Sequence, residues 1–276
     1  MTLRTALRQG TEILTKAGVH EPRLTAEVLL CHALRREKVY LYSHPEHELS
    51  TVEWIHYGRY LHERSGGKPT QYITRVQEFY GREFGVSPAV LIPRPETEHV
   101  VEEALKVAPG ARRVLDIGTG SGALAVTLAL ELGAFAVGPD LSLEAVGVAR
   151  GNAARLGARA EFVQCDLAAA VGGRFPLIVS NPPYIPAREM GTLQHEVRDH
   201  EPHLALLGGE AGTEVYERIV PQAEGLLEPG GRLVFEIGYQ GEAGVRAAFG
   251  ERWSEVRTVC DLAGWPRVVL GRFTPE

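Results

Sequence analysis

The sequence lacks long apolar runs and has little cysteine, and both absences narrow the classes of protein to which it can belong. None of its 276 residues lies in an apolar run of about 18 or more, and the opening MTLRTALRQG has no apolar signal segment. We therefore expect no membrane association and a cytoplasmic location. Three widely spaced cysteines, Cys31, Cys165 and Cys260, form no CxxC pair, which argues against a disulfide framework or a zinc site.

An excess of basic residues is also missing. The chain has 29 lysines and arginines against 35 aspartates and glutamates, a net charge of −6. Proteins dedicated to nucleic acids usually carry a basic surface, so we expect no direct nucleic-acid target. The charge is unevenly spread, since residues 1–90 carry 12 basic against 10 acidic side chains and the rest carry 17 against 25. This division suggests two parts with different tasks.

The first part is predicted to be helical. Over residues 1–68 apolar residues recur at steps of three and four, which is typical of amphipathic helices. One helix begins at Pro22, where the missing N–H of proline does no harm, and we expect Leu24, Val28 and Cys31 on its buried side. Residues 1–68 are therefore expected to form a small helical domain.

The next segment, residues 69–93, is predicted to be a β-hairpin that links two domains. Its aromatic and β-branched residues, Tyr72 and Ile73 among them, favour strands, and Gly81-Arg82 suits a tight turn.

From residue 94 to residue 276 short apolar runs alternate with helical stretches. Such alternation is typical of an α/β fold with a mostly parallel sheet covered on both faces. The last two apolar runs are separated only by a short turn, so we expect them to form an antiparallel hairpin at the end of the sheet. The seven runs are Arg113–Ile117, Phe135–Val137, Glu161–Cys165, Leu177–Ser180, Arg232–Ile237, Val256–Cys260 and Pro266–Leu270.

A glycine-rich turn follows the first of these strands and leads into an apolar helix. Glycine lets the backbone turn sharply and approach a ligand closely, and the start of a helix offers free N–H groups. A nucleotide-like cofactor would fit there, although any tight strand-to-helix turn also uses glycine. The residues of the turn are Gly118, Thr119, Gly120, Ser121 and Gly122.

Acidic residues after the neighbouring strands favour S-adenosylmethionine over a dinucleotide. Asp140 lies about 20 residues beyond the glycines, where a carboxylate can accept hydrogen bonds from ribose hydroxyls. The spacing G-x-G-x-G departs from the dinucleotide pattern G-x-G-x-x-G, and Asp116 directly before the turn is also unusual for it. Asp166 could accept a hydrogen bond from the amino group of adenine, with Leu167 packed on the adenine ring. An N-cap of a following helix is an equally good interpretation of Asp166.

The fourth strand ends in the stiff loop Asn181-Pro182-Pro183-Tyr184. Two prolines fix the backbone, so the side-chain oxygen of Asn181 and the carbonyl of Pro182 can together accept both hydrogens of an –NH2 group. Tyr184 can stack on a planar amide or ring. The loop therefore predicts nitrogen methylation, with Asn181, Pro182 and Tyr184 as its working residues, although Asn and Pro also occur in ordinary turns.

These motifs together resemble the release factor glutamine methyltransferase family, also called HemK or PrmC. The stretch IPRPETE, residues 92–98, is far more specific than Asn-Pro-Pro-Tyr alone, and the resemblance spans nearly the whole chain. Further matching motifs are Gln71–Ile73, Glu78–Gly81, Asp116–Gly122, Ser180–Ile185, Glu201-Pro202 and Glu236–Gly238.

The resemblance implies a Rossmann-like, seven-stranded, S-adenosylmethionine-dependent methyltransferase domain and an N-terminal helical domain that helps bind the substrate. The implied reaction methylates N5 of the glutamine in the Gly-Gly-Gln loop of peptide-chain release factors, leaves S-adenosylhomocysteine, and modulates translation termination. Carried over by motif, Gly118–Gly122 and Asp140 bind the donor, Leu167 flanks its adenine, and Asn181, Pro182, Pro183 and Tyr184 bind the glutamine, with Asn181 also touching the donor. Pro139 departs from the family pattern and could shift the side chain of Asp140.

Two other functions compete with this one. A DNA adenine or RNA guanine N-methyltransferase would also use such a loop, but it should show a basic stripe or a target-recognition segment. An adenosine-sensing protein that binds translation factors without catalysis would have no use for an amine-orienting loop. A cluster of acidic and histidine side chains could suggest a metal, but its spacing fits no familiar ligand motif, and we expect no metal: His195, Glu196, Asp199, His200, Glu201 and His203.

Overall fold

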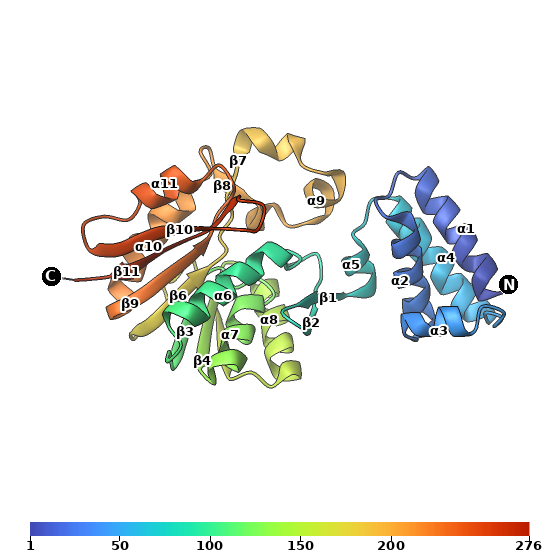
Figure 1. Ribbon diagram of the computed structural model, residues 1–276, viewed down its shortest axis with the longest axis horizontal. Coiled ribbons are helices and arrows are strands. Elements are labelled where there is room, and N and C mark those ends of the chain that lie inside the picture. The colour runs from blue at the N-terminus through green and yellow to red at the C-terminus, as the bar shows by residue number, and fades with distance from the viewer. Residues whose placement is uncertain (276) are drawn as a thin grey trace. The chain divides into compact units, whose positions relative to one another are not determined.

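A computed structural model describes residues 1–275, which divide into two compact units (Figure 1). The helical unit comprises Met1–Val76 together with Gln194–His200, and the sheet unit comprises the other described residues. The segment Gln194–His200 contains the short helix α9 (His195–His200), whose Glu196 forms an ion pair of 2.8 Å with the buried Arg64. A piece of chain from the second half of the sequence therefore belongs to the helical unit.

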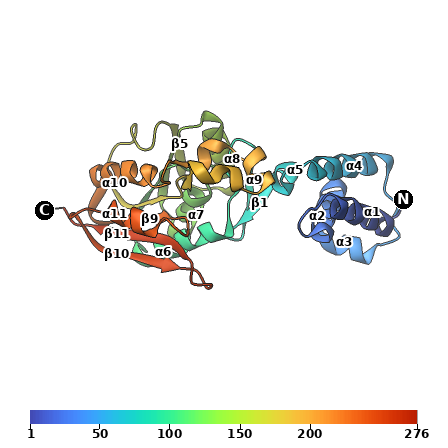
Figure 2. The ribbon, with the colours of Figure 1, turned by 90° about the horizontal axis from the view of Figure 1, so that it is seen from above.

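The helices of the helical unit share one apolar core, and α1 and α4 begin at side-chain caps. Thr2 accepts a hydrogen bond from the backbone of Thr5, and Ser50 and Glu53 form a reciprocal capping box. In Figure 2, α1 to α3 lie together on one side of α4. The helices are α1 (Leu3–Lys16), α2 (Pro22–Leu34), α3 (Lys38–Ser43), α4 (Thr51–Ser65) and α5 (Thr70–Thr74).

Helix α2 begins at Pro22 as expected, but the prediction of its buried side was wrong. Leu24 and Val28 are exposed, and Cys31 is half-buried. The face turned to α1 and α4 instead carries alanines and leucines. Glu27 is also buried, and its carboxylate accepts hydrogen bonds from Arg23 and Tyr42 and forms an ion pair with Lys38. The buried apolar residues of α2 are Ala26, Leu29, Leu30, Ala33 and Leu34.

A close approach between α1 and α4 depends on glycine. A Cβ built on Gly10 would lie 1.9 Å from the hydroxyl oxygen of the fully buried Tyr57. We predict that Gly10→Ala lowers the free energy of unfolding by about 2 kcal/mol through overpacking, although alanine favours helices. The matched control is Gly58→Ala, because a Cβ there meets nothing within 4 Å, so about 0.5 to 1 kcal/mol of added stability is expected. Chemical denaturation of both variants checks the prediction, and a stabilised Gly10→Ala would contradict it.

The segment expected to be a hairpin linker begins with a helix. Tyr72 and Ile73 lie in α5, because the N–H of Ile73 bonds to the carbonyl of Pro69 and the helical turn continues until Arg75, at φ 64°. The hairpin itself comprises β1 (Val76–Phe79) and β2 (Arg82–Gly85). Its turn is Tyr80-Gly81, both at positive φ, rather than Gly81-Arg82, since two left-handed residues match the twist of a hairpin.

The sheet unit is built on a seven-stranded sheet, so the predicted α/β fold class is confirmed. The strand order is β10-β11-β9-β6-β3-β4-β5; β10 and β11 run antiparallel to their neighbours, and the other pairs are parallel. The strands are β3 (Arg113–Asp116), β4 (Phe135–Asp140), β5 (Ala160–Gln164), β6 (Phe175–Ser180), β9 (Leu227–Glu236), β10 (Trp253–Cys260) and β11 (Pro266–Phe273).

Helices cover both faces of this sheet, as the alternation of strands and helices predicts (Figure 1). One apolar core lies under α6 (Glu98–Val107), α7 (Ala123–Leu132) and α8 (Leu143–Leu156). The other lies under α10 (Glu214–Leu226) and α11 (Glu242–Ala247). The middle of each central strand is apolar because both faces of the strand are buried. No helix within residues 1–275 is both long and apolar enough to span a bilayer.

The topology places a crevice beside β3. The chain runs from β3 to β4 and β5 in one direction, then returns to place β6 on the other side of β3. Ligands of open α/β sheets bind outside the carboxyl ends of strands at such a switch point. Three short elements contribute residues to the crevice: the 3-10 helices η1 (Pro95–Thr97) and η3 (His203–Ala205) and the strand β8 (Leu207–Gly209). Strand β8 pairs with β7 (Ile185–Pro186), which is followed by the 3-10 helix η2 (Ala187–Thr192).

Candidate functional site

A cavity of about 440 Å³ lies at the carboxyl ends of β3, β4 and β6. This volume is in the range of pockets that take small molecules and cofactors. The structure brings most of the sequence-predicted site residues into its wall: Gly118, Thr119, Gly120, Ser121, Asp140, Asp166, Leu167, Asn181 and Pro183. Gly122, Pro182 and Tyr184 are not part of this wall.

The glycine turn is tight, but its first N–H groups are already bonded within the protein. Gly118 and Gly120 have φ values of 74° and 55°, and a Cβ on either would meet nothing within 4 Å, so both leave open space beside the backbone. The N–H groups of Gly118 and Thr119 both donate to the carbonyl of Pro139, at 3.0 and 3.1 Å. These two N–H groups are therefore not free for a ligand. The expectation of free N–H groups concerned the start of the helix, which begins at Ala123, and stays a prediction.

The carboxylate of Asp140 is fixed at the end of β4. It accepts the N–H of Gly120 at 2.8 Å and the N–H of Ser142 at 2.9 Å. Burial raises the pKa of Asp140, while these two donors and the N–H of Leu141 act in the opposite direction. Pro139 does not displace the side chain from the cavity wall, because β4 continues through Pro139 to Asp140.

Asp116 ends β3 as a buried carboxylate in the cavity wall. Its Oδ2 accepts the hydroxyl of Thr119 at 2.7 Å and the N–H of Ala125 at 3.1 Å, whereas its Oδ1 has no hydrogen-bond partner among the described residues. Burial raises the pKa of Asp116 to about 7. A buried carboxylate oxygen without a partner is costly, so a ligand that supplies a donor or a positive charge there would relieve the cost.

Asp166 follows β5 and is exposed enough to form an ion pair. Its Oδ2 lies 2.6 Å from the guanidinium of Arg218 on α10, and both residues line the cavity. Leu167 has a φ of 50°, a left-handed conformation that turns the chain at the cavity wall. The charged residues of the wall are Asp116, Asp140, Glu144, Asp166 and Arg218. The cavity is therefore acidic overall.

The Asn181 loop lies opposite the glycine turn, and its asparagine is fixed by a residue far away in the sequence. The Nδ2 of Asn181 donates to the Oγ1 of Thr97 at 3.2 Å. Pro182 is buried, and Gly208 approaches the loop so closely that a Cβ on it would lie 2.7 Å from the carbonyl oxygen of Pro183. The loop is therefore a rigid part of the wall.

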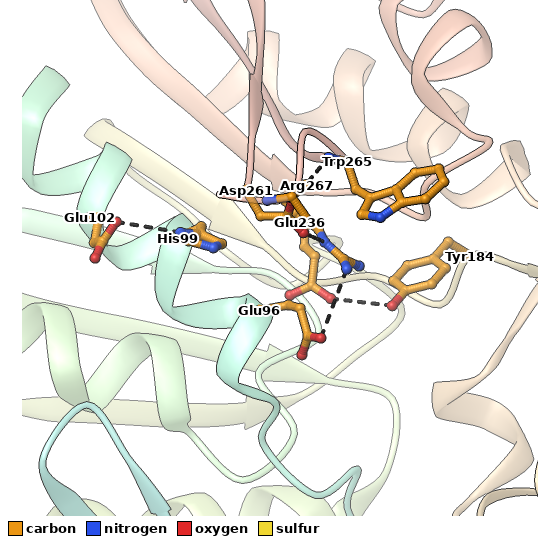
Figure 3. Close-up of polar contacts among 9 residues, drawn as sticks. Glu96, His99, Glu102, Tyr184, Glu236, Asp261, Trp265 and Arg267 are labelled. Atoms are coloured by element: carbon orange, nitrogen blue, oxygen red, sulfur yellow. Dashed lines mark hydrogen bonds and ion pairs between the residues drawn. The ribbon is translucent and has the colours of Figure 1, made fainter.

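The hydroxyl of Tyr184 contacts a buried glutamate. This hydroxyl lies 3.3 Å from the Oε1 of Glu236, and Figure 3 shows this contact with Glu96 and Arg267 beside it. The carboxylate of Glu96 is 3.9 Å from the guanidinium of Arg267. Burial raises the pKa of Glu236 to about 7, against the hydrogen bonds from Thr97 and Tyr184.

Motif-by-motif sequence reasoning missed several residues that build this site. Thr97 and Glu236 support the loop, and Glu201 is a buried carboxylate that pairs with Arg94 and accepts the N–H of Ile92 at 3.3 Å. All of them lie in the motifs that carry the family resemblance, but only the fold shows which residue each one contacts.

The acidic and histidine residues near position 200 do not form a metal centre in the described part of the chain. Glu196 pairs with Arg64, Glu201 pairs with Arg94, and His195 contacts Asp199 at 2.9 Å. Across residues 1–275 no group of three or more His, Cys, Asp or Glu side chains is placed to bind a metal ion.

The wall fits S-adenosylmethionine better than a dinucleotide. An acidic cavity in which one carboxylate oxygen has no partner among residues 1–275 favours a ligand that carries an ammonium and a sulfonium, and disfavours a pyrophosphate. The bonded N–H groups of the glycine turn point to the same conclusion, because a pyrophosphate site needs them free.

Two protein families match the chain. Residues 5–74 match the PrmC N-terminal domain, and residues 97–205 match the methyltransferase small domain. The release factor glutamine methyltransferase of Koribacter versatilis is 47% identical over 99% of each chain. The protein of the same name from Bacillus subtilis is 39% identical over 97% of this chain and 96% of its own.

Solved structures share the fold. A methyltransferase from Pyrococcus furiosus matches with a TM-score of 0.55 at 19% identity, covering 71% of this chain and 91% of that one. A 16S rRNA N2 G1207 methyltransferase of T. thermophilus matches with a TM-score of 0.54 at 23% identity, covering 72% of this chain and 49% of that one. The near full-length identity to named relatives confirms the resemblance seen in the motifs: the chain belongs to the release factor glutamine methyltransferase family and is an S-adenosylmethionine-dependent methyltransferase.

Proposed function

We propose that this protein transfers a methyl group from S-adenosylmethionine to N5 of the glutamine in the Gly-Gly-Gln motif of peptide-chain release factors. S-adenosylhomocysteine is the second product, and the modification modulates translation termination in the cytoplasm. The observation that carries the proposal is the Asn181 side chain, whose amide nitrogen is bonded to Thr97 and whose oxygen is left for a substrate in an acidic cavity. Names of near full-length relatives support the choice of release factors as substrate.

We assign the donor to the wall formed by the glycine turn, Asp116 and Asp140. Asp140 would accept from the ribose hydroxyls, and the partnerless Oδ1 of Asp116 would accept from the donor ammonium. Leu167 would flank the adenine, with Asp166 near its amino group. When bound, S-adenosylmethionine would supply a methyl group on a sulfonium. This methyl group is electrophilic because the neutral thioether that remains is a good leaving group.

The substrate amide nitrogen is a poor nucleophile, because its lone pair is delocalised into its carbonyl. The Oδ1 of Asn181 and the carbonyl of Pro182 would accept its two hydrogens, which raises electron density on nitrogen and aims it at the methyl group. Tyr184 would pack against the amide plane. The bond between sulfur and methyl would break as the bond between nitrogen and methyl forms, S-adenosylhomocysteine would leave as a neutral thioether, and the nitrogen would lose one of its two protons to water during or after the transfer. Alignment of the two reactants is the main task of the protein, so we propose neither a strong general base nor a metal.

The helical unit is proposed to bind the release factor through its exposed apolar side chains. Leu24 and Val28 lie one turn apart on α2, each about 40% exposed, at 43% and 38%. We predict that the double variant Leu24→Asp, Val28→Asp raises KM for the release factor about 10-fold and leaves kcat unchanged, because about 1.4 kcal/mol of docking is lost. The matched control is Ile13→Asp on α1, which is 44% exposed. Equal KM values in steady-state assays of the three proteins would contradict this docking face.

A substrate panel tests the proposed function against its rivals. The protein is incubated with radiolabelled S-adenosylmethionine and, separately, a release factor, DNA and RNA, with and without a chelator. We expect label in the release factor alone, at the same rate with chelator. Label in DNA or RNA but not in the release factor would establish the nucleic-acid methyltransferase, and binding of the donor without any transfer would establish the sensor.

A further inference from the structure

A chain of hydrogen bonds leads from the proposed substrate loop into the core of the sheet unit. The Nδ2 of Asn181 donates to the Oγ1 of Thr97 at 3.2 Å, and that hydroxyl donates to the Oε2 of Glu236 at 2.5 Å. Thr97 and Glu236 are buried, at 4% and 3% exposure. The three residues come from the loop after β6, from η1 and from the end of β9, so the fold alone brings them together.

The hydroxyl of Thr97 makes this contact and does not cap a helix. Thr97 is the last residue of η1, which continues directly into α6, and its φ of −65° and ψ of −20° are helical. Its side chain makes no capping bond and is bonded to Glu236 and Asn181.

The donors and acceptors available fix the direction of every hydrogen bond in this series. An ionised carboxylate can only accept, and the two oxygens of Glu236 face two hydroxyls, those of Thr97 and Tyr184. A threonine hydroxyl has one hydrogen, so once it donates to Glu236 it can only accept from Asn181. The amide of Asn181 must then turn its nitrogen to Thr97, which leaves its oxygen for the cavity.

We propose that Thr97 and Glu236 are positioning residues that fix the amide of Asn181 with its oxygen toward the nitrogen to be methylated. The inference rests on the proposed function, in which a substrate –NH2 group donates to that oxygen. If the side-chain amide of Asn181 were rotated by half a turn, its –NH2 group would face the –NH2 group of the substrate. Both groups are donors, so no hydrogen bond could form between them. Only one of the two rotamers of Asn181 is therefore productive, and the buried glutamate selects it.

This direction requires an ionised Glu236. Burial is the largest influence on its carboxyl group and raises the pKa to about 7. The hydrogen bonds from Thr97 and Tyr184 and the guanidinium of Arg267 on β11 favour the carboxylate, while Glu96 on η1 opposes it (Figure 3). The hydroxyl of Tyr216 on α10 donates to the backbone carbonyl of Glu236 at 2.8 Å and so leaves both carboxylate oxygens to Thr97 and Tyr184. Above neutral pH the carboxylate is ionised, and assays at about pH 8.5 test this state.

The experiment compares Thr97→Val, which keeps the shape and removes the hydroxyl, with Thr97→Ser, which keeps the hydroxyl. At saturating donor and release factor, we expect kcat of Thr97→Val to fall about 10-fold to 100-fold and kcat of Thr97→Ser to stay within about three-fold of the parent. The dissociation constant of S-adenosylmethionine, from calorimetry, should change less than about three-fold in both. Thr127→Val is the matched control, because it removes a buried hydroxyl on α7 that has no hydrogen-bond partner in the described chain, and its kcat should be unchanged.

Three results would overturn the positioning role: Thr97→Val with parental kcat, Thr97→Ser as slow as Thr97→Val, or a loss of donor affinity that matches the loss of kcat. Each compares variants with a parent protein that methylates the release factor. A parent that labels no release factor refutes the proposed function instead, so the two failures are distinguishable. Thermal denaturation of each variant shows that the measured chains are folded.

Discussion

Asn181→Ala is expected to lower kcat on the release factor about 100-fold to 1,000-fold while the protein still binds S-adenosylmethionine with nearly parental affinity. In the proposed function the side-chain oxygen of Asn181 is the acceptor that aims the substrate nitrogen, so its loss would remove orientation worth about 3 to 4 kcal/mol of transition-state stabilisation. Single-turnover kinetics with saturating donor measure the loss directly, and calorimetry measures the donor affinity.

Asn181→Gln is the companion variant, because it keeps the amide and moves it by one methylene group. We expect it to be nearly as slow as the alanine variant, since a displacement of this size spoils the alignment. Near-normal turnover of Asn181→Ala with bound donor would show that the orienting role is wrong. A variant that has lost donor binding as well would place Asn181 in the donor site instead.

Asp116→Asn is expected to weaken binding of S-adenosylmethionine about 10-fold to 100-fold and, at the same time, to stabilise the protein without donor. The Oδ1 of Asp116 is a buried oxygen without a partner among the described residues, and it is the group we assign to the donor ammonium. In the variant the –NH2 group of asparagine replaces this oxygen and faces the ammonium of S-adenosylmethionine. Both groups are hydrogen-bond donors, so the contact is lost. The Oδ1 of asparagine can still accept from Thr119 and Ala125, which bond to Oδ2 of the aspartate.

The stability change depends on pH, and its sign follows from the pKa of Asp116. Burial raises that pKa from 3.8 to about 7, so the folded state binds the proton more tightly than the unfolded state. Asp116 therefore makes the free energy of unfolding fall as pH rises from about 4 to about 7, by an amount on the order of 2 to 4 kcal/mol. Asparagine does not titrate, so the variant gains most above pH 7.

Urea denaturation of both proteins at pH 5 and pH 8 measures this effect. We expect a smaller difference in the free energy of unfolding between the two pH values in Asp116→Asn than in the parent. A pH dependence remains in the variant, because burial also raises the pKa of Asp140 and raises that of Glu236 to about 7. An Asp116→Asn protein that is less stable at pH 8 and binds the donor as well as the parent would contradict both parts of the prediction.

The sheet was predictable because its strands are buried on both faces. The runs Phe135–Val137 and Leu177–Ser180, for example, are apolar except for the final serine of the second, and both lie in strands of the sheet. The carboxyl ends of parallel strands meet at one edge, so the order of motifs along the chain already brings Gly118, Asp140 and Asn181 to one place. All three line the cavity.

Contacts between distant parts of the chain were not predictable from local patterns. Leu24 and Val28 form an apolar pair on α2, yet α1 and α4 pack against another face, because burial depends on which side the neighbours cover. The N–H groups of Gly118 and Thr119 bond to Pro139, 20 or more residues away, which no turn motif reveals. Thr97 and Glu236 are 139 residues apart and meet only in the folded chain.

The most direct test of the account is the site of methylation on a release factor. The protein, a release factor and S-adenosylmethionine labelled with deuterium in its methyl group are incubated together, and the digested release factor is sequenced by mass spectrometry. We predict one labelled methyl group on the side-chain nitrogen of the glutamine in Gly-Gly-Gln and none in a release factor with that glutamine changed to alanine. Label at another residue, or equal label in the alanine variant, would contradict the account.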